Sequence, residues 1–433
     1  MTKTYEIRDA IYGFIELNEW EREIINHPVY QRLRRIRQLS LTDMVYPGAM
    51  HTRFEHSLGV MHVATRMFDE IKKRRSDFLK SELLFTSEGL GRDRVIVRLS
   101  SLLHDIGHAP FSHAAEELMD KDSKGKPYKH EHYSAAAVLF LMQDVIENHP
   151  LNQNYEIKAQ DIADFLNGSP KLERRLLWRS LVSSQLDADR ADYLLRDSHH
   201  VGVAYGKYDL DRLLVTLTVA IDPETNSPVI AIEDGGEHAA EALIIARYMM
   251  FTQVYFHLTR RIYDYHAVQI LKHLLREHRN NIEVFPPPTT KQDVEEYLKW
   301  DDWRVLGMVQ EGGGGKDGDI LRKRKHHRCI FQTPEIPGKS DLEEMAEVLV
   351  RLGDRVSFTD TAESSWYKHD ENDIPILVRP GEKNETLTPL SSLSSVVSGL
   401  KPIARRRIYV PEEKKDEARG IVSKIKKNKE LRP

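Results

Sequence analysis

Four polar side chains in one apolar segment could do chemistry together. The segment LSSLLHDIGHAPFSHAAEEL, residues 99–118, places His104, Asp105, His108 and His113 within ten positions. Buried imidazole and carboxylate groups must be paired, hydrogen bonded or bound to a metal. Adjacent helical residues point about 100° apart, so His104 and Asp105 could share an ion only beside the helix edge. A metal site here would therefore need ligands from other segments.

Two other segments offer such ligands. HTRFEHSLG, residues 51–59, and QLDADRADYLLRD, residues 185–197, each place histidine or aspartate in an apolar helical frame. Imidazole and carboxylate together suit Fe, Mn, Zn, Ni or Co, and Mg when more waters complete the shell.

The motifs resemble those of a known family. The blocks YQRLRRIRQL, YPGAMHTRFEHSLGV, LLHDIGHAPFSH, HEHYS, DADRADYLLRDSHHVG and RRIYDYH occur in this order. They resemble the HD-domain metal phosphohydrolases, and in particular the deoxynucleoside triphosphate triphosphohydrolases of the SAM-and-HD-domain type. The resemblance covers about residues 5–270 and includes no SAM domain.

The resemblance implies a metal-dependent reaction. His56, His104, Asp105 and Asp189 match the four metal ligands. Attack at the α-phosphate would release a deoxynucleoside and triphosphate, with Mg²⁺ as a further ion on the triphosphate.

The same resemblance implies catalytic roles for the remaining histidines. His113 matches the histidine that serves as general acid, a role that suits a group with an ordinary pKa near neutrality. Glu116 would orient it, although relatives carry aspartate there. His130 matches a further site histidine, and His108 matches a phosphate contact.

A third set of residues is implied to bind substrate. Arg53 and Arg190 match the triphosphate cations, and the others match sugar-side and base-side positions: Gln38, Leu39, Tyr193, Asp197, Tyr263 and Asp264. Arg190 replaces a lysine, and its planar fork changes the phosphate geometry. Tyr255 stands where relatives carry a third arginine, for which Arg247 or Arg260 could substitute. Asp264 replaces a glutamine.

These residues need a mainly helical frame. Apolar spacing predicts helices over 54–73, 93–106, 132–147, 159–167, 171–184 and 186–197, and one long helix or two over 238–278. We expect an HD-domain helical core over residues 1–285. FPPPTT and EGGGGKDGD predict a linker and glycine-rich loop over 286–320. Strand-like runs and a helix at 339–353 predict a small α+β domain over 321–433.

Composition limits the functional class. The 433 residues carry a formal charge of −4. Basic and acidic residues are therefore too evenly balanced to indicate that the whole protein surface binds nucleic acid. The single cysteine, Cys329, excludes an internal disulfide and suits a reducing compartment. There is no apolar run of membrane-spanning length. We therefore expect a cytoplasmic enzyme without membrane contact.

Several alternatives remain open at this stage. The metal ligands also suit an HD-type phosphodiesterase or nuclease, or another nucleotide phosphohydrolase, and a non-catalytic nucleotide-sensing module is the third interpretation. The resemblance implies a homo-oligomer, dimer or tetramer. It also implies a nucleotide activator site that includes Gln31 and Arg34. The basic run at 321–329 leaves weak nucleic-acid binding open, although a solvated strand edge or loop explains it better.

Overall fold

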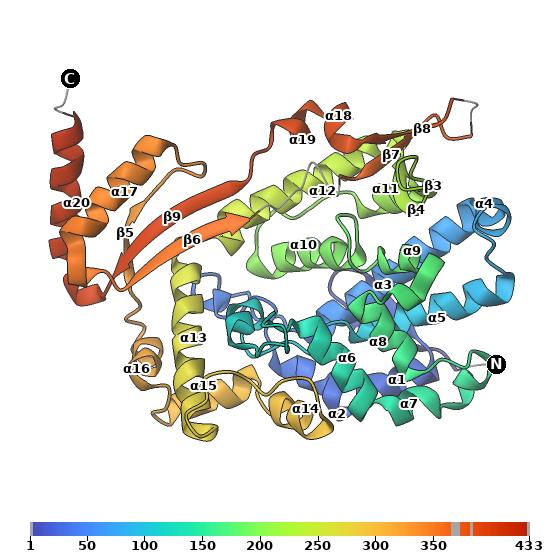
Figure 1. Cartoon of the computed structure of the whole chain (residues 1–433), viewed down its shortest axis with the longest axis horizontal. Coiled ribbons are helices and arrows are strands. Elements are labelled where there is room, and N and C mark those ends of the chain that lie inside the picture. The colour runs from blue at the N-terminus through green and yellow to red at the C-terminus, as the bar shows by residue number, and fades with distance from the viewer. Residues whose placement is uncertain (1–2, 365–372, 382–383, 431–433) are drawn as a thin grey trace.

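The molecule is a mainly helical body with a small mixed unit at one end. The computed structural model describes residues 3–364, 373–381 and 384–430. The C-terminal helix lies at one end of the long axis and the N-terminus at the other (Figure 1). The expected fold class, mainly α with a C-terminal α+β part, is confirmed.

The helical body contains the helices up to residue 278. They are α1 Glu19–Asn26, α2 Pro28–Gln31, α3 Arg53–Arg74, α4 Ser76–Ser81, α5 Ser87–Leu103, α6 His130–Leu141, α7 Gln143–Glu147, α8 Ala159–Asn167, α9 Leu176–Arg179, α10 Ala188–Val201, α11 Leu210–Val215, α12 Glu237–Met250 and α13 Leu258–His278. A 3-10 helix spans Ser112–Leu118.

Helix α3 is the centre of the body. It packs against both α5 and α10, and nearly all its inward residues are buried. Gly59 permits the close approach to α10, because an added Cβ would lie 1.9 Å from Asp192 Oδ1. Thr52 and Glu55 form a capping box that fixes the start of α3. The helix that carries the RFEHSLG motif is thus held at its first turn and along its length.

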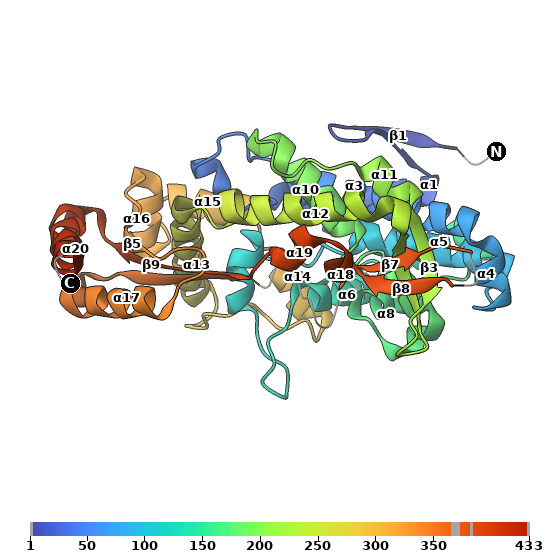
Figure 2. The ribbon, with the colours of Figure 1, turned by 90° about the horizontal axis from the view of Figure 1, so that it is seen from above.

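The long segment after residue 236 forms two helices, which settles the alternative left open by the sequence. A single π-helical stretch, Phe251–Tyr255, separates α12 from α13. Helix α12 runs along the length of the body when the molecule is seen from above (Figure 2).

The expected linker over 286–320 is largely helical, so that prediction was wrong. It contains α14 Lys291–Leu298, α15 Asp302–Gln310 and the start of α16 Gly315–Lys323. Tyr297, Trp300 and Val305 are fully buried against α13, which offsets the entropy cost of ordering this segment. The glycine-rich run is fixed by an ion pair of 2.7 Å between Asp317 and His266.

Three small sheets, counted over the described residues, complete the fold. β1 Tyr5–Asp9 and β2 Gly13–Leu17 form the N-terminal hairpin. The second sheet has the order β3-β4-β7-β8, from Leu217–Ile221, Pro228–Glu233, Pro375–Val378 and Thr386–Pro389. The third has the order β5-β9-β6, from Arg328–Gln332, Ile403–Val410 and Phe358–Ser364.

The C-terminal region therefore contributes both to a sheet of the helical body and to the separate mixed unit. Strand β7 pairs in parallel with β4, so β7 and β8 extend a sheet of the helical body. The third sheet packs against α17 Lys339–Leu352 and α20 Lys415–Glu430 to form the mixed unit. Two short helices lie between β8 and β9: α18 Leu390–Leu393 and α19 Ser395–Gly399. No helix in the described ranges is long and apolar enough to cross a membrane.

Candidate active site

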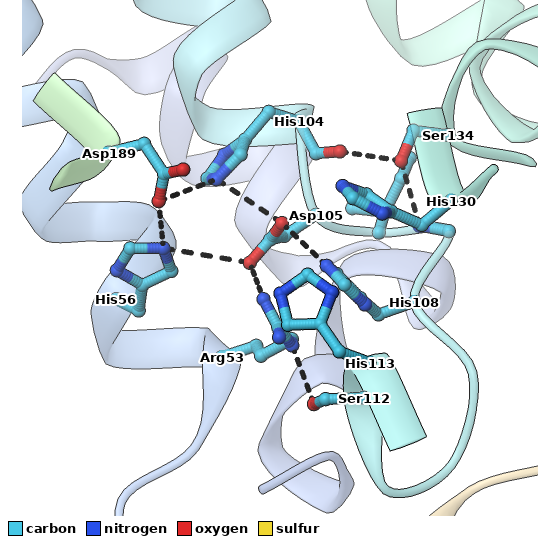
Figure 3. Close-up of polar contacts among 12 residues, drawn as sticks. Arg53, His56, His104, Asp105, His108, Ser112, His113, His130, Ser134 and Asp189 are labelled. Atoms are coloured by element: carbon cyan, nitrogen blue, oxygen red, sulfur yellow. Dashed lines mark hydrogen bonds and ion pairs between the residues drawn. The ribbon is translucent and has the colours of Figure 1, made fainter. Parts of the chain in front are cut away.

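The four expected metal ligands converge from three helices. His56 lies on α3, His104 and Asp105 at the end of α5, and Asp189 in the first turn of α10 (Figure 3). His56 Nε2 is 3.0 Å from Asp189 Oδ1, and His104 Nε2 is 4.0 Å from the same atom. Asp105 closes the group, with Oδ1 3.2 Å from His104 Nε2. The ligand atoms of His56, His104 and Asp189 lie close enough together to hold a divalent ion.

The outer nitrogens of both rings are fixed by hydrogen bonds. His56 Nδ1 donates to Asp192 Oδ2 at 2.7 Å, and His104 Nδ1 donates to the Ser101 carbonyl at 2.7 Å. Each ring therefore points its Nε2 toward the centre. Both Nε2 atoms are buried and have no hydrogen-bond partner among the described residues. This arrangement is typical of metal-binding histidines and fits a divalent ion.

The carboxylates of the centre are held in their charged form. Burial alone would raise the pKa of Asp189, but the neighbouring His56 ring lowers it to about 2. Burial also opposes the charge of Asp105, whose pKa falls well below its usual range because Arg53 lies beside it. Arg53 Nη1 donates to Asp105 Oδ2 at 2.5 Å. Both acids are therefore ready to bind a cation.

A second cluster adjoins the first. Glu116 Oε1 accepts hydrogen bonds from His113 Nδ1 and His130 Nδ1, each at 2.9 Å. The His130 ring stacks on His108 at 3.8 Å between centroids. His108 Nε2 lies 3.2 Å from Asp105 Oδ1, so the two clusters touch.

The electrostatics of this cluster differ from group to group. Burial would raise the pKa of Glu116, but the hydrogen bonds from His113 and His130 lower it below its usual range. Burial and the charge of Arg53 lower the pKa of His108 well below its usual range, so this ring is neutral. The His113 side chain is 65% exposed and can reach a ligand in the cavity.

The loop between the two clusters is clamped by Ser134 of α6. Its hydroxyl donates to the His104 carbonyl at 2.6 Å and accepts from the Gly107 amide at 2.9 Å. Gly107 itself allows this contact, because an added Cβ would lie 2.3 Å from the Ser134 nitrogen. The HDIGH turn is thereby held in close contact with α6.

The first residue of α15 supports the site from outside. Buried Asp302 accepts hydrogen bonds from the Arg37 and Phe111 amides, both at 2.8 Å. Phe111 has φ +60° and Ser112 has φ +56°, the left-handed region that costs energy in residues other than glycine. Asp302 therefore holds a strained turn directly before His113.

Two adjoining cavities surround these groups. The larger has a volume of about 690 Å³ and the smaller, around the metal ligands, about 220 Å³. They share Gln38, Arg53, His113 and Tyr193. Most residues expected to bind substrate line one or both: Gln38, Leu39, Arg53, Arg190, Tyr193, Asp197 and Asp264.

The cationic residues occupy different positions. Arg190 lines the smaller cavity, where its guanidinium bonds to Asp187 and to the Ser184 carbonyl. Arg260 lines the larger cavity. Arg247 lines neither cavity and donates to Gln185 Oε1 at 2.9 Å. Of the two arginines considered as replacements for the third cation, Arg260 therefore has the suitable position.

Tyr263 is not brought to the cavity, which corrects its expected position on the substrate side. Its ring is fully buried, and its hydroxyl lies 3.0 Å from His326 Nδ1. The residues of α13 point in different directions, so Asp264 faces the cavity while its neighbour faces the interior.

The basic run at 321–329 is mostly engaged within the protein. Arg324 donates to the Met44 carbonyl at 3.0 Å, and Arg328 pairs with Glu412. His326 and His327 are buried.

Sequence reasoning missed several partners in the site. Asp192 lies three residues after Asp189, so helical spacing could have placed both on one face of α10. Ser134 lies in the quoted HEHYS block but received no role. His51 and Tyr255 both contact Asp197, and no local pattern predicts that contact.

Comparison with known proteins shows which protein family this chain resembles. It matches the HD domain over residues 53–197 and the HD associated region over residues 208–334. It is 31% identical to an uncharacterized protein of Methanocaldococcus jannaschii, covering 98% of this chain and 83% of that protein. The deoxynucleoside triphosphate triphosphohydrolase SAMHD1 of Gallus gallus is 33% identical over 48% of this chain and 35% of its own length. A crystal structure of a hypothetical protein from Aquifex aeolicus has a TM-score of 0.77 and 28% identity, covering 97% of this chain and 100% of that one.

Proposed function

Because this chain belongs to the HD-domain phosphohydrolase family, we propose that it hydrolyses deoxynucleoside triphosphates to deoxynucleoside and triphosphate. One observation carries the proposal. The metal-ligand cluster, the His113–Glu116 pair and a cavity lined by Gln38, Tyr193 and Asp197 adjoin one another. A nucleotide spanning both cavities would bring its α-phosphate between the two clusters.

The ligand set for a divalent ion would be His56, His104, Asp105 and Asp189. An ion held there would polarise a phosphoryl oxygen and lower the pKa of a coordinated water. Imidazole and carboxylate ligands favour Fe, Mn, Zn, Ni or Co, and Mg²⁺ would accompany the triphosphate.

His113 would protonate the leaving 5′-oxygen. Its Nδ1 is bonded to Glu116, which fixes the ring and leaves Nε2 available. His130 would help to hold Glu116 through its own hydrogen bond of 2.9 Å to the same oxygen, Oε1.

Arg53, Arg190 and His108 would bind the triphosphate. Both arginines are paired with carboxylates of the protein, with Asp105 and Asp187 respectively. A triphosphate would exchange these ion pairs for charge-assisted hydrogen bonds to its own oxygens. Gln38, Leu39, Tyr193 and Asp197 would surround the sugar, and Asp264 would lie near the base.

The wider setting follows from the same relatives. We propose a homo-oligomer, dimer or tetramer, acting in the cytoplasm. A nucleotide activator at Gln31 and Arg34, and weak nucleic-acid binding by the basic run, are secondary proposals. Light scattering with and without added GTP would test the oligomer and the activator together.

Product analysis tests the proposed reaction. The purified protein is incubated with each dNTP, each NTP or single-stranded DNA, with Mn²⁺ or Mg²⁺, and the products are separated. Inorganic triphosphate and deoxynucleoside are expected from dNTPs. Mononucleotides from DNA would instead indicate a nuclease, and no turnover with any combination would indicate a sensing module.

A substitution at Asp189 tests the ligand assignment. Asp189→Ala should abolish metal binding and hydrolysis together. Asp211→Ala removes an exposed aspartate paired with Arg66 on the surface and should leave both unchanged. Full metal stoichiometry in Asp189→Ala would contradict the assignment.

A further inference from the structure

Asp197 in the larger cavity is held from two sides. Its Oδ1 accepts a hydrogen bond from His51 Nε2 at 2.7 Å, and its Oδ2 accepts one from the Tyr255 hydroxyl at 2.6 Å. All three side chains are buried, and Asp197 and Tyr255 line the cavity. The carboxylate is therefore fixed in one orientation at the cavity wall.

The π-helical stretch between α12 and α13 delivers Tyr255 to this position. Such stretches occur frequently at functional sites. Arg260 Nη1 donates to the Tyr255 carbonyl at 2.5 Å, and Arg260 Nε donates to Thr42 Oγ1 at 2.9 Å. These bonds tie the end of the stretch to the segment after Gln38 and Leu39. The backbone that carries the phenol is thus fixed as well.

The phenol acts as a permanent donor. Burial and the charge of Asp197 raise the pKa of Tyr255 well above its usual range, so its proton stays in place at neutral pH. An ionised carboxylate offers about four lone-pair sites. His51 and Tyr255 use two of them, and the remainder can accept hydrogen bonds from a ligand.

The rings beside Asp197 form a corner. The Tyr193 and Tyr255 rings lie 6.2 Å apart between centroids, at 70° to each other. A sugar ring placed in this corner would direct a hydroxyl to the free lone pairs of Asp197.

We propose that Tyr255 determines specificity for the sugar hydroxyl, by fixing Asp197 as the acceptor of that hydroxyl's hydrogen bond. This inference rests on the proposed hydrolysis of deoxynucleoside triphosphates. Tyr255 acts here through Asp197 as a positioning residue. A substrate without the 3′-hydroxyl cannot donate a hydrogen bond to the fixed acceptor. Its kcat/KM should therefore not change when the phenol is removed.

Replacing the phenol by a phenyl ring tests the inference. The ratio of kcat/KM for a dNTP to that for its 2′,3′-dideoxy analogue is measured for the full chain and for Tyr255→Phe. The ratio should fall by about tenfold or more, the loss expected for one hydrogen bond to a charged group. The value of kcat/KM should fall for the dNTP and stay nearly unchanged for the dideoxy analogue.

Tyr248→Phe is the matched control. It removes a hydrogen bond of 2.9 Å from a tyrosine to Glu335, outside the cavity, and should leave the ratio unchanged. If Tyr255→Phe does not fold, as judged by its melting temperature, His51→Ala removes the other bond to Asp197 and should lower the same ratio.

The outcomes separate the two proposals. Suppose that the wild-type protein hydrolyses dNTPs and that the variant keeps the wild-type ratio, including the case in which kcat/KM falls equally for both substrates. The proposed role of Tyr255 is then wrong, and the proposed function is unaffected. If the wild-type protein does not hydrolyse dNTPs, the proposed function is wrong and the role of Tyr255 falls with it.

Discussion

At the residue scale, the candidate metal centre depends on groups behind its ligands. Asp192 accepts the Nδ1 proton of His56 and is itself held by Arg196, whose Nε and Nη2 lie 2.9 Å from its two oxygens. Arg196 also pairs with Asp9 at 2.8 Å. The chain Asp9–Arg196–Asp192–His56 is buried, so the ring has little freedom to turn.

Asp192→Asn should weaken metal binding without removing a ligand. The uncharged amide lowers the basicity of His56 and holds its ring less firmly, and such changes typically cost about 10–100-fold in metal affinity. Titration of Mn²⁺ into chelator-treated protein measures the effect. Asp161→Asn, which disturbs a half-buried pair with Arg92 away from the site, is the control. Wild-type affinity in Asp192→Asn would contradict this account of the ring.

At the element scale, residues 300–302, at the start of α15, fix the turn that carries His113. Arg32 Nη2 donates to the Trp300 carbonyl at 2.5 Å, and Asp301 pairs with Arg35 at 2.5 Å. Asp302 adds its two bonds to backbone amides. Three consecutive residues thus connect the expected linker region to the site.

Asp302→Ala should destabilise the fold most at low pH. The loss of its acceptor leaves the Arg37 and Phe111 amides unpaired, at a cost of about 2–5 kcal/mol. Burial raises the pKa of Asp302 to about 6, above its ordinary value near 4 in the unfolded chain. The folded state therefore binds this proton more tightly, and the contribution of Asp302 to stability is full below about pH 4 and declines as pH rises through about 6.

Urea unfolding at several pH values measures this difference. The free-energy gap between wild-type and Asp302→Ala should shrink from pH 5 to pH 7.5. Asp293→Ala, in the first turn of neighbouring α14, controls for the loss of a negative charge. If the difference in unfolding free energy instead grew with pH, the pKa of Asp302 would be lowered by folding and not raised, which would contradict this account.

At the scale of the whole molecule, the C-terminal unit takes part in the site. Phe358 of β6 lines the larger cavity. Buried Asp360 joins Arg261 of α13, at 2.6 Å, to Arg407 of β9, at 3.1 Å, and Arg407 also donates to the Phe256 carbonyl at 2.6 Å. The sheet β5-β9-β6 is therefore fastened to the π-helical stretch that delivers Tyr255.

The sequence predicted the parts that depend on local pattern. Apolar spacing located α3, α8 and α17, and the quoted motifs located the expected ligand residues that the structure brings together. Long-range contacts were not predictable in this way. The glycine-rich run is ordered by His266, about fifty residues earlier, and β7 pairs with β4 across more than 140 residues. The direction of Tyr263 depended on how α13 is rotated against β5, which its own sequence does not specify.

The claim that the α-phosphate is attacked is tested most directly by hydrolysis of a dNTP in H₂¹⁸O. In the proposed reaction, attack of water at the α-phosphorus breaks its bond to the 5′-oxygen, and His113 would give that oxygen its proton. One ¹⁸O atom should therefore enter the inorganic triphosphate, and none should enter the deoxynucleoside, as measured by mass spectrometry. Label in the 5′-hydroxyl, or in phosphate or pyrophosphate released instead of triphosphate, would contradict the account.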